Sequence, residues 1–114
     1  MSNTTTMSAK TIRAITKYGM EACIKAYTAN AMHGEGPATV ACIVDGINSV
    51  AAANAAIHAG REIMRSQLQA AVYGGTATSR DIVRLVDMLR VPPSERAATI
   101  LSFECINHNR RLGC

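Results

Sequence analysis

Apolar side chains recur every three or four residues along most of this chain, the spacing that places them on one face of an α-helix. The first such segment runs from Ala9 to about Asn30, with Ser8 in position to cap its start. A longer one runs from Val50 to about Tyr73 and stops at Gly74-Gly75. We therefore expect a helix over each segment.

The apolar positions of the Val50–Tyr73 helix follow a near-heptad seam. The seam comprises Val50, Ala53, Ile57, Gly60, Met64, Gln67 with Leu68, and Ala71. Small residues dominate the first half of the helix, namely Ala51, Ala52, Ala53, Ala55, Ala56, Ala59 and Gly60. Small side chains allow a second backbone to approach the helix closely. We interpret this helix as the structural centre and, as a hypothesis, as the surface through which the chain forms a homo-oligomer.

Two short segments separate these helices. The stretch His33-Gly34-Glu35-Gly36-Pro37 suits a connector better than a phosphate-binding loop, because no strand precedes it and no Lys-Ser/Thr pair follows it. Residues 38–44 (ATVACIV) suit either a strand or a buried helical turn. We expect a helical turn because a lone strand would lack a partner, and Asn48 or Ser49 can then cap the next helix.

The segment from Thr78 to Gly113 predicts two helices joined by a corner. Thr78 and Asp81 have the spacing of a capping box at the start of the first helix. Pro92-Pro93 ends that helix, because proline cannot continue it. Ser94 is placed to cap the second helix. The buried stripe of that helix is expected to comprise Ala97, Ile100, Leu101 and Cys105, widened by Phe103 and Ile106.

Together these segments predict an all-α fold, a small single-domain bundle of four to five helices with a C-terminal helical hairpin. Residues 1–7 are expected to form a flexible tail and residues 8–114 one helical domain. The chain has 114 residues, 48% of them hydrophobic, which is enough for one core. Aromatic residues make up 4%, so this core buries little area per residue, which again favours an oligomer.

Positive charge lies at the two ends of the chain, whose formal net charge is +4. Residues 1–30 carry four basic residues against one acidic residue, and residues 78–114 carry six arginines against four acidic residues. Lys10, Arg13 and Lys17 fall on the polar face of the first helix. They form either a basic stripe for phosphates or an ordinary solvated face, strengthened by a Glu21–Lys25 pair.

Nothing in the sequence predicts a membrane segment or an exported protein. No apolar run approaches the roughly 18 residues of a membrane span, and the N-terminus lacks the basic-then-apolar order of a signal peptide. The four cysteines follow no disulfide framework. We expect a cytoplasmic protein with reduced thiols and no contact with a membrane.

Candidate chemistry is sparse. Cys105, His108 and Cys114 supply three possible zinc ligands but lack a paired Cys-x2-Cys, and His58 has Glu62 alone at helical spacing. The sequence contains no Gly-x-Ser-x-Gly elbow, no His-Glu-x-x-His, no phosphate loop and no dinucleotide fingerprint. We therefore expect neither catalysis nor a metal or cofactor.

Residues Ile82 to Phe103 place a helix, a corner with Pro and Ser, and a second helix in an order that resembles helix-turn-helix DNA-binding proteins. Three positions depart from that family's pattern. Val86 replaces a small residue, Arg90 replaces the usual turn glycine, and Arg96 replaces an apolar anchor. The resemblance implies a recognition helix beginning with Ser94, Glu95, Arg96 and Thr99, with Arg84 and Arg90 on the DNA backbone.

An ordinary helical hairpin with a Pro-Pro-Ser corner shares this pattern, so two functions stay open. The first is a non-catalytic, nucleic-acid-associated regulator. Its binding residues would be Arg84, Arg90, Ser94, Arg96, Thr99, Arg110 and Arg111 near the C-terminus, with Lys10, Arg13 and Lys17 in the first helix. The second is a small adaptor or inhibitor that docks on an acidic partner protein, of the kind that phages and plasmids direct against host defences.

Overall fold

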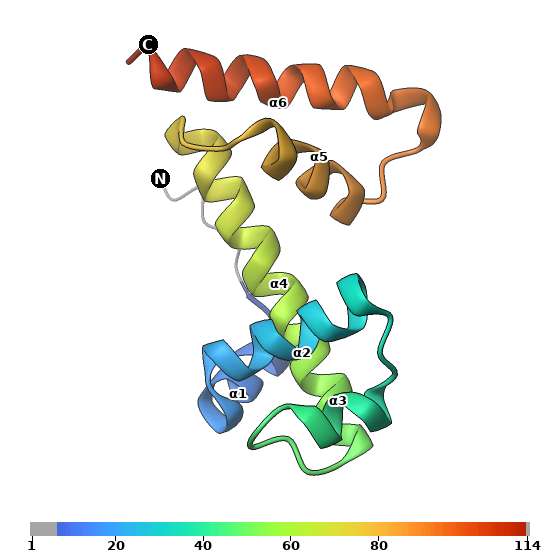
Figure 1. The fold of residues 1–114 in the computed structure, drawn as a ribbon. Coiled ribbons are helices and arrows are strands. Elements are labelled where there is room, and N and C mark those ends of the chain that lie inside the picture. Colours follow the sequence, from blue (N-terminus) through green and yellow to red (C-terminus); the bar gives the residue numbers. More distant parts are fainter. Residues whose placement is uncertain (1–6, 114) are drawn as a thin grey trace. The chain divides into compact units, whose positions relative to one another are not determined.

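The computed structural model describes residues 7–113, which form helices joined by short connections (Figure 1). Residues 1–6 of the predicted tail and the ligand role considered for Cys114 lie outside the described residues. The helices are α1 (Ala9–Tyr18), α2 (Met20–His33), α3 (Pro37–Ile43), α4 (Val50–Gly74), α5 (Ser79–Met88) and α6 (Arg96–Arg111), with a 3-10 turn, η1 (Pro93–Glu95), before α6. The predicted all-α fold with a C-terminal helical hairpin is confirmed.

The chain divides into two compact units, Met1–Met64 and Arg65–Cys114, named unit 1 and unit 2 below. Helix α4 contributes its N-terminal part to unit 1 and its C-terminal part to unit 2. Unit 1 also contains α1 to α3, and unit 2 contains α5, η1 and α6. That residues 8–114 form one domain stays a prediction.

Gly19 divides the single helix that we expected from Ala9 to about Asn30. Its φ of 90° and ψ of 150° lie outside the helical region, in a conformation that L side chains rarely adopt. The Gly19 N–H donates to the Ile15 carbonyl at 2.8 Å and closes the last turn of α1. The prediction of one continuous helix was wrong because the three-four spacing of apolar residues continues unbroken across the glycine.

Met7, which we placed in the flexible tail, is described and partly buried. It packs against the hydrophobic core of unit 1. That residues 1–7 form a flexible tail stays a prediction.

Small side chains form the centre of unit 1. Ala26 of α2 and Ala53, Ala56 and Ala59 of α4 have no exposed surface. A Cβ atom placed on Gly60 would lie 2.6 Å from the Tyr27 Cβ and would collide with the Cys23 carbonyl, so α2 and α4 pack backbone against backbone. Ala53 and Gly60 of the seam are thus covered within the chain, whereas Val50 at its start is exposed. Formation of a homo-oligomer through this helix stays a prediction.

The connections within unit 1 match the expected turn chemistry. Gly34 ends α2 with a φ of 68°, and the Asn30 side chain donates to the Glu35 carbonyl at 2.8 Å. Residues 38–43 are helical, as expected, with Pro37 in the first turn of α3. The Ser49 hydroxyl accepts the Ala52 N–H at 3.0 Å and caps α4.

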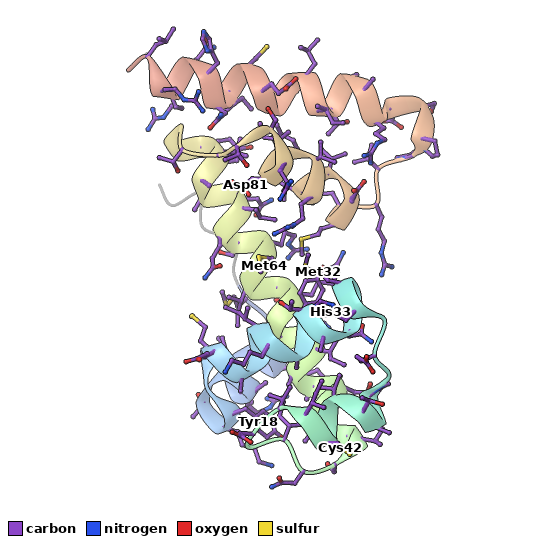
Figure 2. All side chains as sticks on the ribbon, viewed as in Figure 1. Tyr18, Met32, His33, Cys42, Met64 and Asp81 are labelled. Carbon is purple, nitrogen blue, oxygen red and sulfur yellow. The ribbon has the colours of Figure 1, made fainter. Side chains whose placement is uncertain are left out.

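In unit 2, α5 and α6 lie side by side as the predicted hairpin (Figure 1). The Thr78 hydroxyl accepts the Asp81 N–H at 3.1 Å, and the Asp81 carboxylate accepts the Thr78 N–H at 3.0 Å, which confirms the capping box. Asp81 lies at the start of α5 in Figure 2. The core of this unit is formed by buried apolar residues of α4 and α5, including Leu68, Val72, Ile82, Leu85 and Val86.

Asn107 fixes α6 to the segment before α5. Its side chain is buried, and its Oδ1 accepts the Ala77 N–H while its Nδ2 donates to the Ala77 carbonyl, both at 3.0 Å. These two bonds satisfy both halves of the amide and both backbone groups of Ala77. Asn107 therefore sets the rotation of α6 about its own axis.

The face of α6 that packs on α5 contains half of the predicted stripe. Ile100, Phe103 and Ile106 are half-buried, as expected, whereas Ala97, Leu101 and Cys105 are exposed. The prediction was wrong for these three because α6 has apolar residues on two sides, and spacing alone does not choose between them. Asn107 makes that choice in the folded chain.

Candidate functional site

Helix α1 presents a basic face in unit 1. Lys10, Arg13 and Lys17 are exposed, while Thr11 and Ala14 of the same helix are buried. The Lys17 Nζ lies 5.4 Å from the centroid of the Tyr18 ring, within the range of a cation–π contact. Because α1 ends at Tyr18 and contains no acidic residue, its own sequence does not neutralise this face.

The predicted Glu21–Lys25 pair forms on α2, beyond the break at Gly19. Its Nζ–Oε1 distance is 3.3 Å, and both side chains are exposed. The pair therefore leaves the three cations of α1 uncompensated on their own helix.

A polar cluster around Glu62 of α4 holds the start of α1 against α4. The Glu62 carboxylate accepts the Thr11 hydroxyl at 2.6 Å, the Ser8 hydroxyl at 3.0 Å and the Ser8 N–H at 3.2 Å. The Ser8 hydroxyl also accepts the Thr11 N–H, so it caps α1 as expected. His58 completes the cluster, with its Nε2 at 2.8 Å from Glu62.

The pKa of Glu62 reflects these contacts. Burial raises the pKa of this carboxyl group, but the hydrogen bonds from Thr11 and Ser8 and the charge of His58 outweigh burial and lower the pKa to about 2. Sequence reasoning paired His58 with Glu62 by spacing but missed the role of Glu62 in anchoring α1. No sequence signal links Glu62 to Ser8, which lies 54 residues away.

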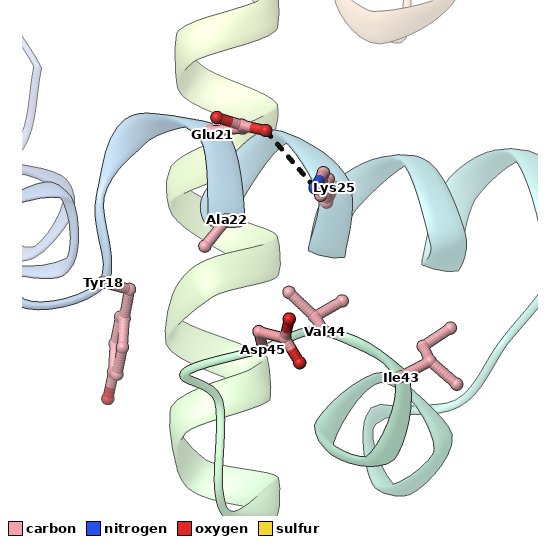
Figure 3. A pocket seen from close by; sticks show the side chains of 7 residues that line it. All are labelled: Tyr18, Glu21, Ala22, Lys25, Ile43, Val44 and Asp45. Carbon is pink, nitrogen blue, oxygen red and sulfur yellow. Dashed lines mark ion pairs between the residues drawn. The ribbon is translucent and has the colours of Figure 1, made fainter.

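A shallow pocket of about 280 Å³ lies between α2 and the end of α3 (Figure 3). Its charged lining residues are Glu21, Lys25 and Asp45, and Tyr18 lies at its edge. The pocket is smaller than a typical site for a small organic ligand, and two carboxylates against one ammonium group disfavour an anion. It offers no arrangement of nucleophile and base.

Two of the residues that the helix-turn-helix resemblance assigned to recognition, Arg96 and Thr99, bind groups within unit 2. The Arg96 guanidinium forms an ion pair with Asp87 across the hairpin corner. The Thr99 hydroxyl donates to the Glu95 carbonyl at 2.8 Å. Ser94 lies exposed in η1 and makes no capping bond to α6, so the prediction that it caps this helix was wrong.

Arg90 adopts a backbone conformation that favours glycine. Its φ is 55°, and it is the one non-glycine residue with positive φ in the described part of the chain. The turn thus has the left-handed backbone conformation that the usual turn glycine would adopt, with arginine at that position. Arg90 is exposed and Arg84 is half-buried.

Arg110 and Arg111 bind backbone carbonyls at and beyond the end of α4. Arg110 Nε donates to the Tyr73 carbonyl at 2.9 Å, and Arg111 donates to the carbonyls of Gly75 and Ala77, both at 3.2 Å. Cations at these positions stabilise the negative end of a helix. Arg110 lies 14 residues after Arg96, about 21 Å along α6, so the predicted hairpin residues form two separate groups.

The second side of α6 is exposed and uncharged, and two of its residues, Leu101 and Cys105, were expected in the core. Leu101 is 61% exposed and Leu112 is 63% exposed. We name this surface the outer face of α6, and it comprises Ala98, Leu101, Cys105 and Leu112. It contains none of the ten predicted binding residues.

Metal and membrane sites find no support in the described residues. Residues 7–113 contain no group of three or more metal-ligating side chains. Cys23, Cys42 and Cys105 are free, and burial raises the pKa of the Cys23 thiol. No helix in that range is long and apolar enough to span a bilayer.

The fold and these surfaces describe a small all-α protein that offers exposed faces and shallow pockets. The chain matches no protein-family profile, no curated protein and no solved structure.

Proposed function

We propose that this protein is a non-catalytic, nucleic-acid-associated protein that contacts phosphates through α1. The observation that carries the proposal is the basic face of this helix. Lys10, Arg13 and Lys17 are exposed within about two turns, and the helix holds no acidic residue. Cations so arranged suit the regular spacing of backbone phosphates.

The polar cluster around Glu62 supports this role. Ser8 and Thr11 bind the carboxylate from the first turn of α1, the turn that carries Lys10. The helix is therefore held in place before any ligand arrives, and little ordering is needed when it binds.

Three phosphate contacts set the strength of the interaction. The binding constant then varies with salt with a logarithmic slope of about −2.7, so affinity falls roughly 40-fold between 50 and 200 mM salt. Binding of this kind is weak and independent of base sequence. Arg84 and Arg90 in unit 2 can add contacts. The Arg96 guanidinium is paired with Asp87, and Arg110 and Arg111 each use part of the guanidinium on backbone carbonyls.

Fluorescence anisotropy with labelled duplex DNA and single-stranded RNA, over a range of salt concentrations, tests the proposal. We expect the triple substitution Lys10→Ala, Arg13→Ala and Lys17→Ala to remove binding at low salt. Lys25→Ala is the matched control, because Lys25 is an exposed lysine already paired with Glu21. Equal affinity of the triple variant and the intact chain would overturn the proposal.

A docking protein is the second candidate, and the outer face of α6 favours it. A helix that reads DNA bases needs polar or charged side chains toward the groove, whereas this face carries leucines, alanine and cysteine. A substitution such as Leu101→Glu separates the two candidates. It leaves binding through α1 intact and removes any association that uses α6.

A further inference from the structure

The outer face of α6 is organised for a partner helix. With His108 it forms a seam at alternating spacings of three and four residues, Ala98, Leu101, Cys105, His108 and Leu112. All five residues are exposed, and two of them are leucines with more than 60% of their surface accessible. Such spacing is the pattern of one helix packing along another.

We propose that this seam binds the same seam of a second copy of the chain, with the two α6 helices antiparallel. Leu101 and Leu112 lie equally far on either side of the midpoint between Ile106 and Asn107, and so do Cys105 and His108. A two-fold axis through that midpoint places Leu101 of each copy opposite Leu112 of the other. It likewise places each Cys105 opposite a His108.

Charge on the flank of the seam favours the same arrangement. Glu104 and Arg111 lie on one flank, and the antiparallel pairing brings Glu104 of one copy to Arg111 of the other. Arg111 uses two N–H groups on the Gly75 and Ala77 carbonyls, so its guanidinium retains donors for a carboxylate. A parallel pairing would instead align each Glu104 with Asn109 and gain no opposite charges.

The size of the seam predicts a weak dimer. From Ala98 to Leu112 it extends about 21 Å, and one pair of helices of this length falls at the low end of specific interfaces. Association should therefore depend strongly on concentration. The inference is independent of the proposed function, because it involves neither nucleic acid nor the cations of α1.

Sedimentation velocity of the full chain tests the proposal, after nuclease treatment, under reducing conditions and between about 5 and 500 µM. We expect the weight-average sedimentation coefficient to rise with concentration. Leu101→Glu should abolish that rise, because it buries carboxylates in the seam. Met32→Glu is the matched control, since Met32 is a comparably exposed apolar residue of α2, and it should dimerise like the intact chain.

Single-cysteine variants test the antiparallel register. In a background with Cys23→Ala, Cys42→Ser, Cys105→Ser and Cys114→Ser, a mixture of Leu101→Cys and Leu112→Cys chains should form disulfides about tenfold faster than either variant alone. Equal rates would overturn the antiparallel pairing. A coefficient that stays constant with concentration, or dimerisation that persists in Leu101→Glu, would overturn self-association. Capture of a different protein through Leu101 by a chain that is itself monomeric would do so as well.

Discussion

At the scale of single residues, Arg90 stands out because its backbone is in the left-handed region with φ of 55°. An L side chain there costs roughly 1–2 kcal/mol. Glycine removes that cost, but its greater conformational freedom in the unfolded chain destabilises the folded chain by about 0.5–1 kcal/mol. The two effects leave a small net gain for glycine at this turn.

We therefore expect Arg90→Gly to stabilise the chain by about 0.5 kcal/mol and Arg90→Val to destabilise it by about 1 kcal/mol or more, since a β-branched residue tolerates positive φ poorly. Urea unfolding followed by circular dichroism measures both changes. A loss of stability on introducing glycine would show that the arginine side chain contributes more than its backbone conformation costs.

At the scale of helices, the close approach of α2 and α4 depends on Gly60. Alanine is the better helix former by about 1 kcal/mol, yet its Cβ would collide with the Cys23 carbonyl and the Tyr27 side chain. Overpacking of this kind costs about 1–3 kcal/mol, and a backbone carbonyl cannot move aside easily.

We expect Gly60→Ala to lower the free energy of unfolding by about 1–2 kcal/mol, against a neutral or slightly favourable effect of Gly74→Ala. Gly74 is the control because it lies at the end of the same helix with open space around the position of its Cβ. Thermal unfolding of the two variants side by side is the measurement. If both raise the melting temperature, the contact between the two helices is looser than described.

Most of the elements could be predicted from the sequence, because their ends are signalled locally. The capping box at Thr78, the cap at Ser49 and the break at Pro92-Pro93 each depend on residues within four positions of one another. Two features were missed from the sequence. Periodicity passes through Gly19 without a change, and the buried side of α6 is chosen by a bond to Ala77, 30 residues away.

At the scale of the whole molecule, the candidate site could be predicted in part. The exposed cations of α1 follow from the amphipathic spacing of Lys10, Arg13 and Lys17. Arg110 and Arg111 carry charges that the sequence shows, but their carbonyl partners at Tyr73, Gly75 and Ala77 are a product of the tertiary fold. The outer face of α6 was not foreseen, because Leu101 and Cys105 were expected to be buried.

Stability at acid pH depends on Glu62. The folded chain lowers the pKa of this carboxyl group from 4.5 to about 2, so its contribution is complete above the unfolded pKa and is lost as pH falls from about 4.5 toward 2. The shift corresponds to roughly 3 kcal/mol. Glu62→Gln should therefore flatten the loss of stability across that range.

The measurement is urea unfolding at a series of pH values between about 2 and 6, spanning the range over which the carboxylate is protonated. Glu21→Gln is the control, because Glu21 is an exposed carboxylate in a surface pair. A variant at position 62 that keeps the full acid sensitivity of the intact chain would mean that other carboxylates dominate.

The two hydrogen bonds between Asn107 and Ala77 have a further consequence. Helix α6 is apolar on two sides, so two rotations about its axis would bury nearly equivalent surfaces, and hydrophobicity alone leaves the choice degenerate. The buried amide, together with the bonds from Arg110 and Arg111, lifts that degeneracy, because the alternative rotation would separate these polar atoms from their partners. An apolar substitution of Asn107 would accordingly lower the stability of the chain. It would also let α6 exchange between two orientations in place of a single one.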